Sequence, residues 1–215
     1  TEEGNYLNIE MQPPLNLLIP MAGKGERFIK AGYQTYKPFI PIVRKPMVQF
    51  VTDAFPSFVR KFVLTNRSML TNEEARILEE DLRCEIIEIP KHNEGPAYSI
   101  YLARKSIPLN ESFFISYCDI YWEWDFSAIQ KCLNKDGIIF THSGFHPHLI
   151  KNNYSAFCLP SKENSLLLEE VKEKQSFTET WMNEHLSIGV FYIKSGNQMM
   201  SSIRTLIEND SRVDG

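Results

Sequence analysis

The sequence predicts an α/β protein in which a mainly parallel central sheet lies between helices in three layers. From Leu15 to Thr141, short apolar runs of strand length alternate with segments of helical periodicity, a pattern typical of this fold class. After Thr141 the apolar runs follow one another without helices between them, so we expect a mixed edge with antiparallel strands. In such sheets, ligands bind at the carboxyl ends of the parallel strands.

The pattern begins with a buried strand that leads into a glycine loop. The run Leu15–Met21 is too short for a helix and is followed at once by Gly23 and Gly25. A short helix is expected over Pro46–Phe55, because proline is favoured in the first turn of a helix. The next strand is expected over Lys61–Thr65.

Strands and helices then alternate through the middle of the chain. Thr71 and Asn72 offer an N-cap for a helix over Glu73–Leu82. The later expected elements are a strand at Cys84–Ile89, a helix at Ala97–Ser106, a strand at Phe113–Cys118, a helix at Phe126–Leu133 and a strand at Gly137–Thr141.

The last part of the chain predicts three strands and a closing helix. The strands are expected at Tyr154–Leu159, Leu166–Lys172 and Ile188–Ile193, and the helix at Asn197–Glu208. Residues 1–14 are polar and end in two prolines, which predicts a lead-in before a single domain over residues 15–215. We expect this domain to be incomplete at its C-terminus.

The composition excludes several classes of protein. The 215 residues carry a net charge of −4 with a pI near 5.8, which argues against non-specific nucleic-acid binding. The sequence has no apolar run of about 18 residues and no signal-peptide pattern at its start, so we expect a cytoplasmic protein with no membrane segment. Four cysteines without C-x-x-C spacing predict buried free thiols.

Positive charge is concentrated in one segment. Residues 24–61 hold eight basic side chains against two acidic ones, a local net charge of +6, which leaves −10 for the rest of the chain. This segment therefore attracts anions.

The glycine loop lies at the start of that segment. A glycine loop after a strand lets backbone N–H groups approach a phosphate, and a neighbouring Lys or Arg neutralises its charge. No Walker A motif is present, since no Gly-Lys-Ser/Thr follows, and Phe28 occupies the third glycine position of the dinucleotide pattern. The two glycines alone also fit a plain strand-to-helix turn.

Three motifs follow one another in this segment: Gly-x-Gly-x-Arg from Gly23, Lys-Pro-apolar-apolar-Pro from Lys37, and a second Lys-Pro at Lys45. This order resembles the signature of the sugar-phosphate nucleotidyltransferases. This family is also called the nucleotide-sugar pyrophosphorylases. The resemblance spans about residues 15–195 and implies a Rossmann-like, GT-A-like nucleotidyltransferase fold. It further implies transfer of a nucleotidyl group from a nucleoside triphosphate to a phosphorylated acceptor, with release of pyrophosphate and a requirement for Mg²⁺.

The resemblance also implies roles for single residues. Arg27 and Lys37 would be catalytic, with Lys37 bridging the α-phosphate and the acceptor phosphate, while Lys30, Arg60 and Lys61 are expected to be solvated. Tyr36 stands where the family usually has proline. The nucleotide would be bound by Ala22, Gly23, Lys24 and Gly25, and by Glu94, Gly95 and Ala97, whose segment resembles the family's Gln-Gly-Thr-Ala.

Two later segments complete the expected site. Asp119 follows an apolar strand and resembles the family's magnesium aspartate, with Cys118 in place of the usual glycine. Glu173, Lys174 and Gly189 would contact the acceptor. Each segment also has a purely structural interpretation: a helix cap at Gly95-Pro96, a turn residue at Asp119 and a solvated strand end at Glu173-Lys174.

The chemistry itself needs positive charge more than a general base. A phosphate monoester is already largely dianionic at neutral pH, so the difficulty is the repulsion between two polyanions. Mg²⁺ prefers few carboxylates together with phosphate oxygens and water, so one early ligand such as Asp119 is reasonable. A second magnesium aspartate is not placed: Asp210 and Asp214 lie near the end of the chain.

Other interpretations stay open at this point. One alternative is a GT-A glycosyltransferase, which would carry an Asp-x-Asp motif. This motif is absent at Asp119, although Glu123-Trp124-Asp125 is a weak counterpart. A non-catalytic nucleotide-binding module is a further alternative. His142, His146 and His148 favour an acceptor-facing or surface loop over a metal site. Tyr121, Trp122 and Trp124 fit either the wall of an acceptor pocket or the core.

The expected partners are a nucleoside triphosphate and a small phosphorylated acceptor. The acceptor we expect is a sugar phosphate for surface polysaccharide, and an oligomer is also compatible with the sequence.

Overall fold

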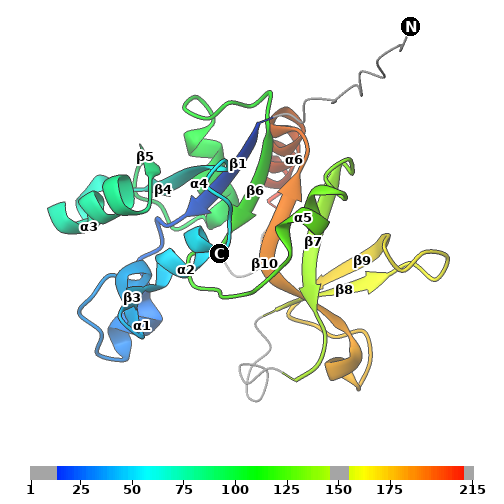
Figure 1. Ribbon diagram of the computed structural model, residues 1–215. Coiled ribbons are helices and arrows are strands. Elements are labelled where there is room, and N and C mark those ends of the chain that lie inside the picture. Colours follow the sequence, from blue (N-terminus) through cyan, green and yellow to red (C-terminus); the bar gives the residue numbers. More distant parts are fainter. Residues whose placement is uncertain (1–13, 146–154, 211–215) are drawn as a thin grey trace, which may run out of the picture.

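The computed structural model describes residues 14–145 and 155–210, and within them the chain forms one eight-stranded sheet with helices around it (Figure 1). The strands of this sheet are β1 (Leu15–Pro20), β4 (Arg60–Thr65), β5 (Cys84–Glu88), β6 (Ser112–Ser116), β7 (Gly137–His142), β8 (Ala156–Pro160), β9 (Leu168–Glu173) and β10 (His185–Ile193). Their order is β5-β4-β1-β6-β10-β8-β9, with β7 also paired to β10.

The helices lie between the strands much as the sequence predicts. They are α1 (Glu26–Lys30), α2 (Met47–Asp53), α3 (Asn72–Arg76), α4 (Pro96–Ala103), α5 (Phe126–Gln130) and α6 (Gly196–Glu208). Shorter turns are η1 (Lys37–Phe39), η2 (Arg67–Met69), the π-helical η3 (Ile77–Asp81) and η5 (Trp181–Asn183), and a small hairpin joins β2 (Pro41–Ile42) to β3 (Lys45–Pro46).

The sheet has a parallel half and an antiparallel half. β5, β4, β1 and β6 are parallel, so their carboxyl ends meet at one edge. β10 runs antiparallel to β6, β7 and β8, and β9 pairs antiparallel with β8. The expected mixed sheet is confirmed, although its antiparallel part supplies four of the eight strands of this sheet rather than a narrow edge.

The two faces of the sheet bury different cores, which gives the three predicted layers. Leu17 and Ile19 of β1 belong to the cluster that packs against α2 and α5, whereas Leu18 faces the cluster of α4 and α6. Successive side chains of a strand point to opposite faces, so a strand covered on both sides reads as an unbroken apolar run.

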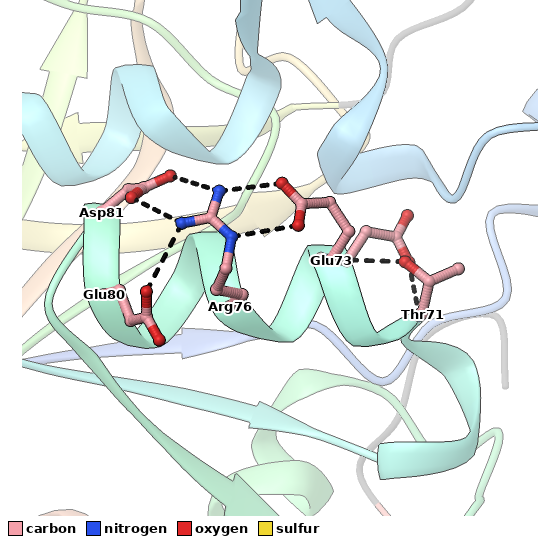
Figure 2. A network of polar contacts seen from close by, with 6 residues as sticks. Thr71, Glu73, Arg76, Glu80 and Asp81 are labelled. Carbon is pink, nitrogen blue, oxygen red and sulfur yellow. Dashed lines mark hydrogen bonds and ion pairs between the residues drawn. The ribbon is translucent and has the colours of Figure 1, made fainter.

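The helix after β4 begins at the predicted cap. Thr71 Oγ1 accepts a hydrogen bond from the Glu74 N–H (3.2 Å), and the Glu74 carboxylate accepts one from the Thr71 N–H (2.7 Å). Figure 2 shows Arg76 of α3 among the carboxylates of Glu73, Glu80 and Asp81. The hydrogen bond from Arg76 lowers the pKa of Glu73, but each of these exposed pairs contributes little to stability.

A second polar cluster joins the strands at their amino ends, on the side opposite the glycine loop. The buried Asn16 amide donates to the Glu111 carboxylate and to the Ser112 carbonyl, both at 2.9 Å, and accepts from Arg60 Nε at 2.9 Å. Arg60 also pairs with Glu111 at 2.5 Å. Lys61 is buried, so the expectation that it is solvated is wrong. Arg60 and Lys30 are exposed as expected, although Arg60 also has Asn16 and Glu111 as partners.

Two elements were not foreseen, α1 and the β2–β3 hairpin. The hairpin turns through Val43 and Arg44, both with positive φ (47° and 76°), although such turns normally use Asn and Gly. All four cysteines are free thiols as predicted, but Cys132 is exposed rather than buried. Among the described residues, none of the helices combines the length and the apolar character needed to cross a membrane.

Candidate functional site

The glycine loop leaves the sheet at the carboxyl end of β1. The Met21 N–H donates to the Leu64 carbonyl of β4 (2.8 Å), and Ala22 is buried beneath the loop. Gly25 adopts φ 66° as the N-cap residue of α1, a conformation that glycine takes without strain. A Cβ at Gly25 would lie 3.1 Å from the Cβ of Lys37, so the loop and the lysine segment are packed directly against each other.

Tyr36 fastens the lysine segment to the same strand end. Its hydroxyl donates a hydrogen bond to the Met21 carbonyl, and burial raises its pKa above the ordinary value. The phenol therefore stays protonated and remains a donor. At the position where the related signature usually has proline, this chain uses a hydrogen bond to fix the backbone before Lys37.

Lys37 forms an ion pair with Asp119. Lys37 Nζ lies 2.6 Å from Asp119 Oδ2, and the two side chains are 22% and 32% exposed. Asp119 follows β6, which neighbours β1 in the sheet, so parallel pairing of these strands brings together two residues that are far apart in sequence. Partial burial strengthens the attraction relative to a fully solvated pair.

The residue before Asp119 is a buried thiol. Burial raises the pKa of Cys118 to about 12, and the nearby charge of Asp119 adds to this shift. The thiol is therefore neutral at physiological pH and has no role as a nucleophile.

A cavity of about 330 Å³ opens beside the loop. Its lining includes both lysines of the site, and its walls are otherwise partly apolar. The lining residues are Lys24, Gly25, Phe28, Ile29, Gln34, Thr35, Tyr36, Lys37 and Met69. This volume lies within the range of small-molecule sites, and Arg27 lies exposed on the adjoining helix α1.

The segment Glu94–Ala97 lies at the start of α4, after β5 leaves the same edge of the sheet. Gly95 has φ 86° and precedes Pro96 at the first helical position, as the sequence predicts. A smaller cavity of about 110 Å³ is lined by Glu94, Ala97, Tyr98, Leu206 and Ile207.

His92, which the sequence did not single out, holds this segment in place. Its Nδ1 accepts a hydrogen bond from the Glu94 N–H (3.2 Å), which requires the unprotonated nitrogen, and its Nε2 lies 2.9 Å from Ser99 Oγ. Burial lowers the pKa of His92. A histidine three residues before a glycine was no recognisable signal, because its two contacts depend on how the loop folds back on α4.

The three expected acceptor residues lie in the antiparallel half of the sheet. Gly189 is in β10 with φ 78°, Glu173 ends β9, and Lys174 follows with φ 57° and donates its N–H to the Ser155 carbonyl at 3.1 Å. The Gly189 carbonyl accepts the Tyr117 N–H at 3.2 Å. This contact brings Gly189 to the end of β6, two residues from Asp119.

Within this arrangement, Asp119 is the residue suited to bind Mg²⁺. Asp119 offers a hard carboxylate oxygen, and the contact with Lys37 uses Oδ2, which leaves Oδ1 for a second interaction. No group of three His, Cys, Asp or Glu side chains suited to a metal occurs in residues 14–145 and 155–210. A site with a single protein carboxylate suits Mg²⁺, which keeps water and phosphate oxygens as its other ligands. Asp210 follows α6, and Asp214 lies outside the described residues.

The competing motifs find structural roles. Asp125 caps α5, because its carboxylate accepts hydrogen bonds from the Ser127 N–H (3.0 Å) and hydroxyl (2.6 Å). Trp122 and Trp124 pack against the core, and Trp124 Nε1 donates to the Ala54 carbonyl at 2.7 Å. Tyr121 is 64% exposed. His142 ends β7, whereas His146 and His148 lie outside the described residues.

Known proteins share the fold described above. The family model described as "MobA-like NTP transferase domain" matches residues 17–180, whereas no curated protein matches the chain. Among solved structures, the nucleoside-diphosphate-sugar pyrophosphorylase from Vibrio cholerae RC9 superposes with a TM-score of 0.70 at 18% identity, over 92% of this chain and 79% of that one.

Two further structures are similar. The inositol-1-phosphate CTP transferase from T. maritima has a TM-score of 0.67 at 17% identity, over 92% of this chain and 76% of that chain. The UTP-bound UGPase from Acinetobacter baumannii has a TM-score of 0.61 at 15% identity, with coverage of 90% and 82%. At these identities the likeness shows a shared fold.

Proposed function

Because the chain belongs to the family of MobA-like NTP transferase domains, we propose that it transfers a nucleotidyl group from a nucleoside triphosphate to a phosphorylated small-molecule acceptor and releases pyrophosphate. The acceptor we propose is a sugar phosphate, and the product a cytoplasmic precursor of surface polysaccharide. The names of the similar structures, which include a nucleoside-diphosphate-sugar pyrophosphorylase, support this choice.

One observation carries the proposal. Lys37 touches the glycine loop at Gly25 and pairs with Asp119 at 2.6 Å. Three separate stretches of the chain thus place an ammonium group, a carboxylate and a bare backbone loop at the carboxyl edge of the parallel strands. A turn role for Asp119 or a plain strand-to-helix turn at the two glycines would not require this convergence.

The groups suit the reaction. An oxygen of the acceptor phosphate attacks the α-phosphorus of the triphosphate, and the bond from that phosphorus to the bridging oxygen breaks as pyrophosphate leaves. No proton has to be removed from the nucleophile. Lys37 offsets the repulsion between the two phosphates, Arg27 and the loop N–H groups bind the departing pyrophosphate, and all act by position and charge.

Asp119 would hold Mg²⁺, with Lys37 beside it. When bound, the ion neutralises charge on the phosphate oxygens. Lys37 Nζ lies 2.6 Å from Asp119 Oδ2 and so orients that carboxylate. The ion pair therefore prepares the carboxylate as a ligand.

The test is pyrophosphate release from pure protein with Mg²⁺, the common nucleoside triphosphates and a panel of sugar, cyclitol and choline phosphates. Lys37→Ala is expected to lower turnover by about 100-fold or more, the usual effect of losing a preorganised charge at the reacting centre, while the circular dichroism spectrum stays unchanged. Lys30→Ala is the matched control, because Lys30 is an exposed lysine of the same basic segment.

Near-normal turnover of Lys37→Ala would remove this residue from the catalytic centre. If no pair of substrates released pyrophosphate while triphosphates still raised the melting temperature by mass action, the protein would be a nucleotide-binding module without transferase activity.

A further inference from the structure

We propose that Phe28 is a positioning residue of the candidate site and that the face of its ring holds the ammonium group of Lys37 in place. This inference rests on the proposed function and deepens it, because it adds an uncharged residue to the groups that place the charge. The sequence alone marked Phe28 only as the residue that breaks the dinucleotide pattern. Three observations in the glycine loop and α1 support the new role.

The first is the distance between the lysine and the ring. Lys37 Nζ lies 5.5 Å from the centroid of the Phe28 ring, within the range of about 6 Å over which an aromatic face attracts an ammonium group. The Lys37 side chain is 22% exposed, and partial removal of water strengthens this attraction. The ammonium group therefore has two partners, the Asp119 carboxylate and an uncharged aromatic face.

The second is the support around the ring. The rings of Phe28 and Tyr33 meet at 68°, with their centroids 5.7 Å apart. The backbone closes the same turn, because the Phe28 N–H donates to the Gly25 carbonyl at 2.9 Å and the Tyr33 N–H donates to the Phe28 carbonyl at 3.0 Å. The backbone and the ring of Phe28 are thus both held by neighbours in the loop.

The third is the place of the ring in the site. Phe28 lines the cavity of about 330 Å³ together with Lys24 and Lys37, so it is part of the wall that a ligand would contact. It also follows Arg27 in α1, a helix without a buried side chain. Gly25 approaches the Cβ of Lys37 and Phe28 approaches its ammonium group. The loop and α1 therefore contact the lysine at both ends of its side chain.

The aromatic partner complements the carboxylate of Asp119. In the proposed function Asp119 is also a magnesium ligand, so its negative charge is shared when a metal ion is bound. The ring of Phe28 has no oxygen for Mg²⁺, and its negative face does not attract phosphate, so neither ligand competes for it. We therefore expect Phe28 to keep Lys37 beside the glycine loop when Asp119 binds a metal ion.

The experiment separates the electrostatic attraction of the ring from its apolar character. Phe28 is replaced by mono-, di- and trifluorinated phenylalanine, because fluorine withdraws electron density from the ring face and weakens its attraction for a cation while the shape of the ring is nearly kept. We expect kcat to fall step by step along the series, by about five-fold in total, while the KM values of both substrates change little. The fall in kcat follows from an ammonium group that is less well placed at the reacting phosphates.

Two ordinary substitutions accompany the series. Phe28→Leu keeps an apolar side chain without an aromatic face and should lower kcat by about five-fold or more, whereas Phe28→Tyr keeps the face and should have nearly normal kcat. Phe50→Leu is the matched control, because the Phe50 ring centroid lies 5.9 Å from Lys45 Nζ, in a cation and ring pair outside the candidate site. Its kcat should equal that of the wild type.

A second measurement needs neither substrate nor metal ion. The melting temperature of the trifluorinated protein is compared with that of the protein with Phe28, once with Lys37 present and once in the Lys37→Ala background. Fluorine also makes the ring more apolar, and the comparison in the Lys37→Ala background corrects for this effect. We expect the change in melting temperature to be about 2 °C less favourable when Lys37 is present.

The outcomes separate this inference from the proposed function. If no pair of substrates releases pyrophosphate, the proposed function fails, while a melting difference that requires Lys37 still supports the contact between Phe28 and Lys37. The inference is overturned if kcat is the same throughout the fluorinated series, since any effect of Phe28→Leu would then come from apolar packing alone. Equal melting changes in the two backgrounds would also overturn it.

Discussion

Lys37 is positioned by two neighbours that carry no charge. Gly25 leaves room for its side chain, and the Tyr36 hydroxyl ties the preceding residue to the end of β1. A lysine has a long and flexible side chain, so these contacts reduce the number of conformations that the ion pair with Asp119 has to restrict. Two uncharged residues thus hold the charged group of Lys37 in place.

At the same scale, His92 predicts a dependence of nucleotide affinity on pH. Burial favours the neutral ring, and Nδ1 must be unprotonated to accept the Glu94 N–H. We call the loop closed when His92 accepts the Glu94 N–H, and open when this hydrogen bond is broken. As the pH falls below the ordinary histidine pKa of 6.5, His92 takes up a proton more readily in the open loop than in the closed loop. The closed loop is therefore fully favoured above pH 6.5 and progressively lost below it.

The measurement is triphosphate affinity between about pH 5.5 and pH 7.5. We expect the affinity of the wild type to fall more steeply toward acid pH than that of His92→Gln, which has no ring to titrate. His185→Gln controls for an exposed histidine elsewhere, and the comparison cancels the titration of the triphosphate itself. Parallel curves for the wild type and His92→Gln would show that His92 does not hold the loop.

The sequence identified the glycine loop and the charged residues of the candidate site, but not every residue that positions them. Gly25, Lys37 and Asp119 stand out because glycine, lysine and aspartate have few uses in such places other than turns and ligand contacts. His92 was missed because a histidine in a loop acquires a positioning role only through the way the loop folds, here back onto Glu94 and Ser99.

At the scale of elements, the β2–β3 hairpin holds unrelieved backbone strain. Val43 is 89% exposed and adopts φ 47°, and Arg44 follows with φ 76°. A β-branched residue in the left-handed region is disfavoured. The strained turn joins the two Lys-Pro segments of the basic region.

Replacing the turn by Asn-Gly, in the double variant Val43→Asn/Arg44→Gly, is expected to raise the free energy of unfolding by about 1 kcal/mol. Chemical denaturation with urea measures the change, and Val43→Ala serves as the control because it keeps the positive φ. A loss of stability in the Asn-Gly variant would contradict this prediction. It would mean that a contact of Val43 or Arg44 stabilises the protein by more than the backbone strain destabilises it.

Elements were predicted where a repeating pattern is long enough to show. Strands such as β1 and β4 read as apolar runs, and the helix at Asn72–Arg76 was marked by its capping threonine. α1 has five residues and no buried side chain, so it has no apolar stripe. The hairpin strands have two residues each, and their turn lacks the residues that usually signal one.

Across the whole molecule, the candidate site and the polar anchor of the strands lie at opposite ends of the parallel sheet. Asn16→Leu removes the hydrogen bonds to Arg60, Glu111 and Ser112 while keeping a side chain of similar size. Because these partners are left partly unsatisfied, we expect a loss of about 2–3 kcal/mol in the free energy of unfolding. This corresponds to a fall of roughly 5–10 °C in melting temperature.

The same variant should keep normal KM values for both substrates, measured well below its melting temperature. Lys37→Ala should show the reverse, with activity lost and stability nearly kept. If Asn16→Leu changed the substrate KM values at that temperature, the two ends of the sheet would be coupled.

The position of β10 has a consequence for the order in which the protein assembles on the ribosome. Residues 185–193 are synthesised after every other strand of the described sheet, yet β7 and the β8–β9 hairpin join the sheet through β10. The four parallel strands are complete once β6 has emerged, whereas β7 and the hairpin must wait for β10. We therefore expect Lys37 and Asp119 to meet before β10 is synthesised, and Gly189 to reach Tyr117 only after it.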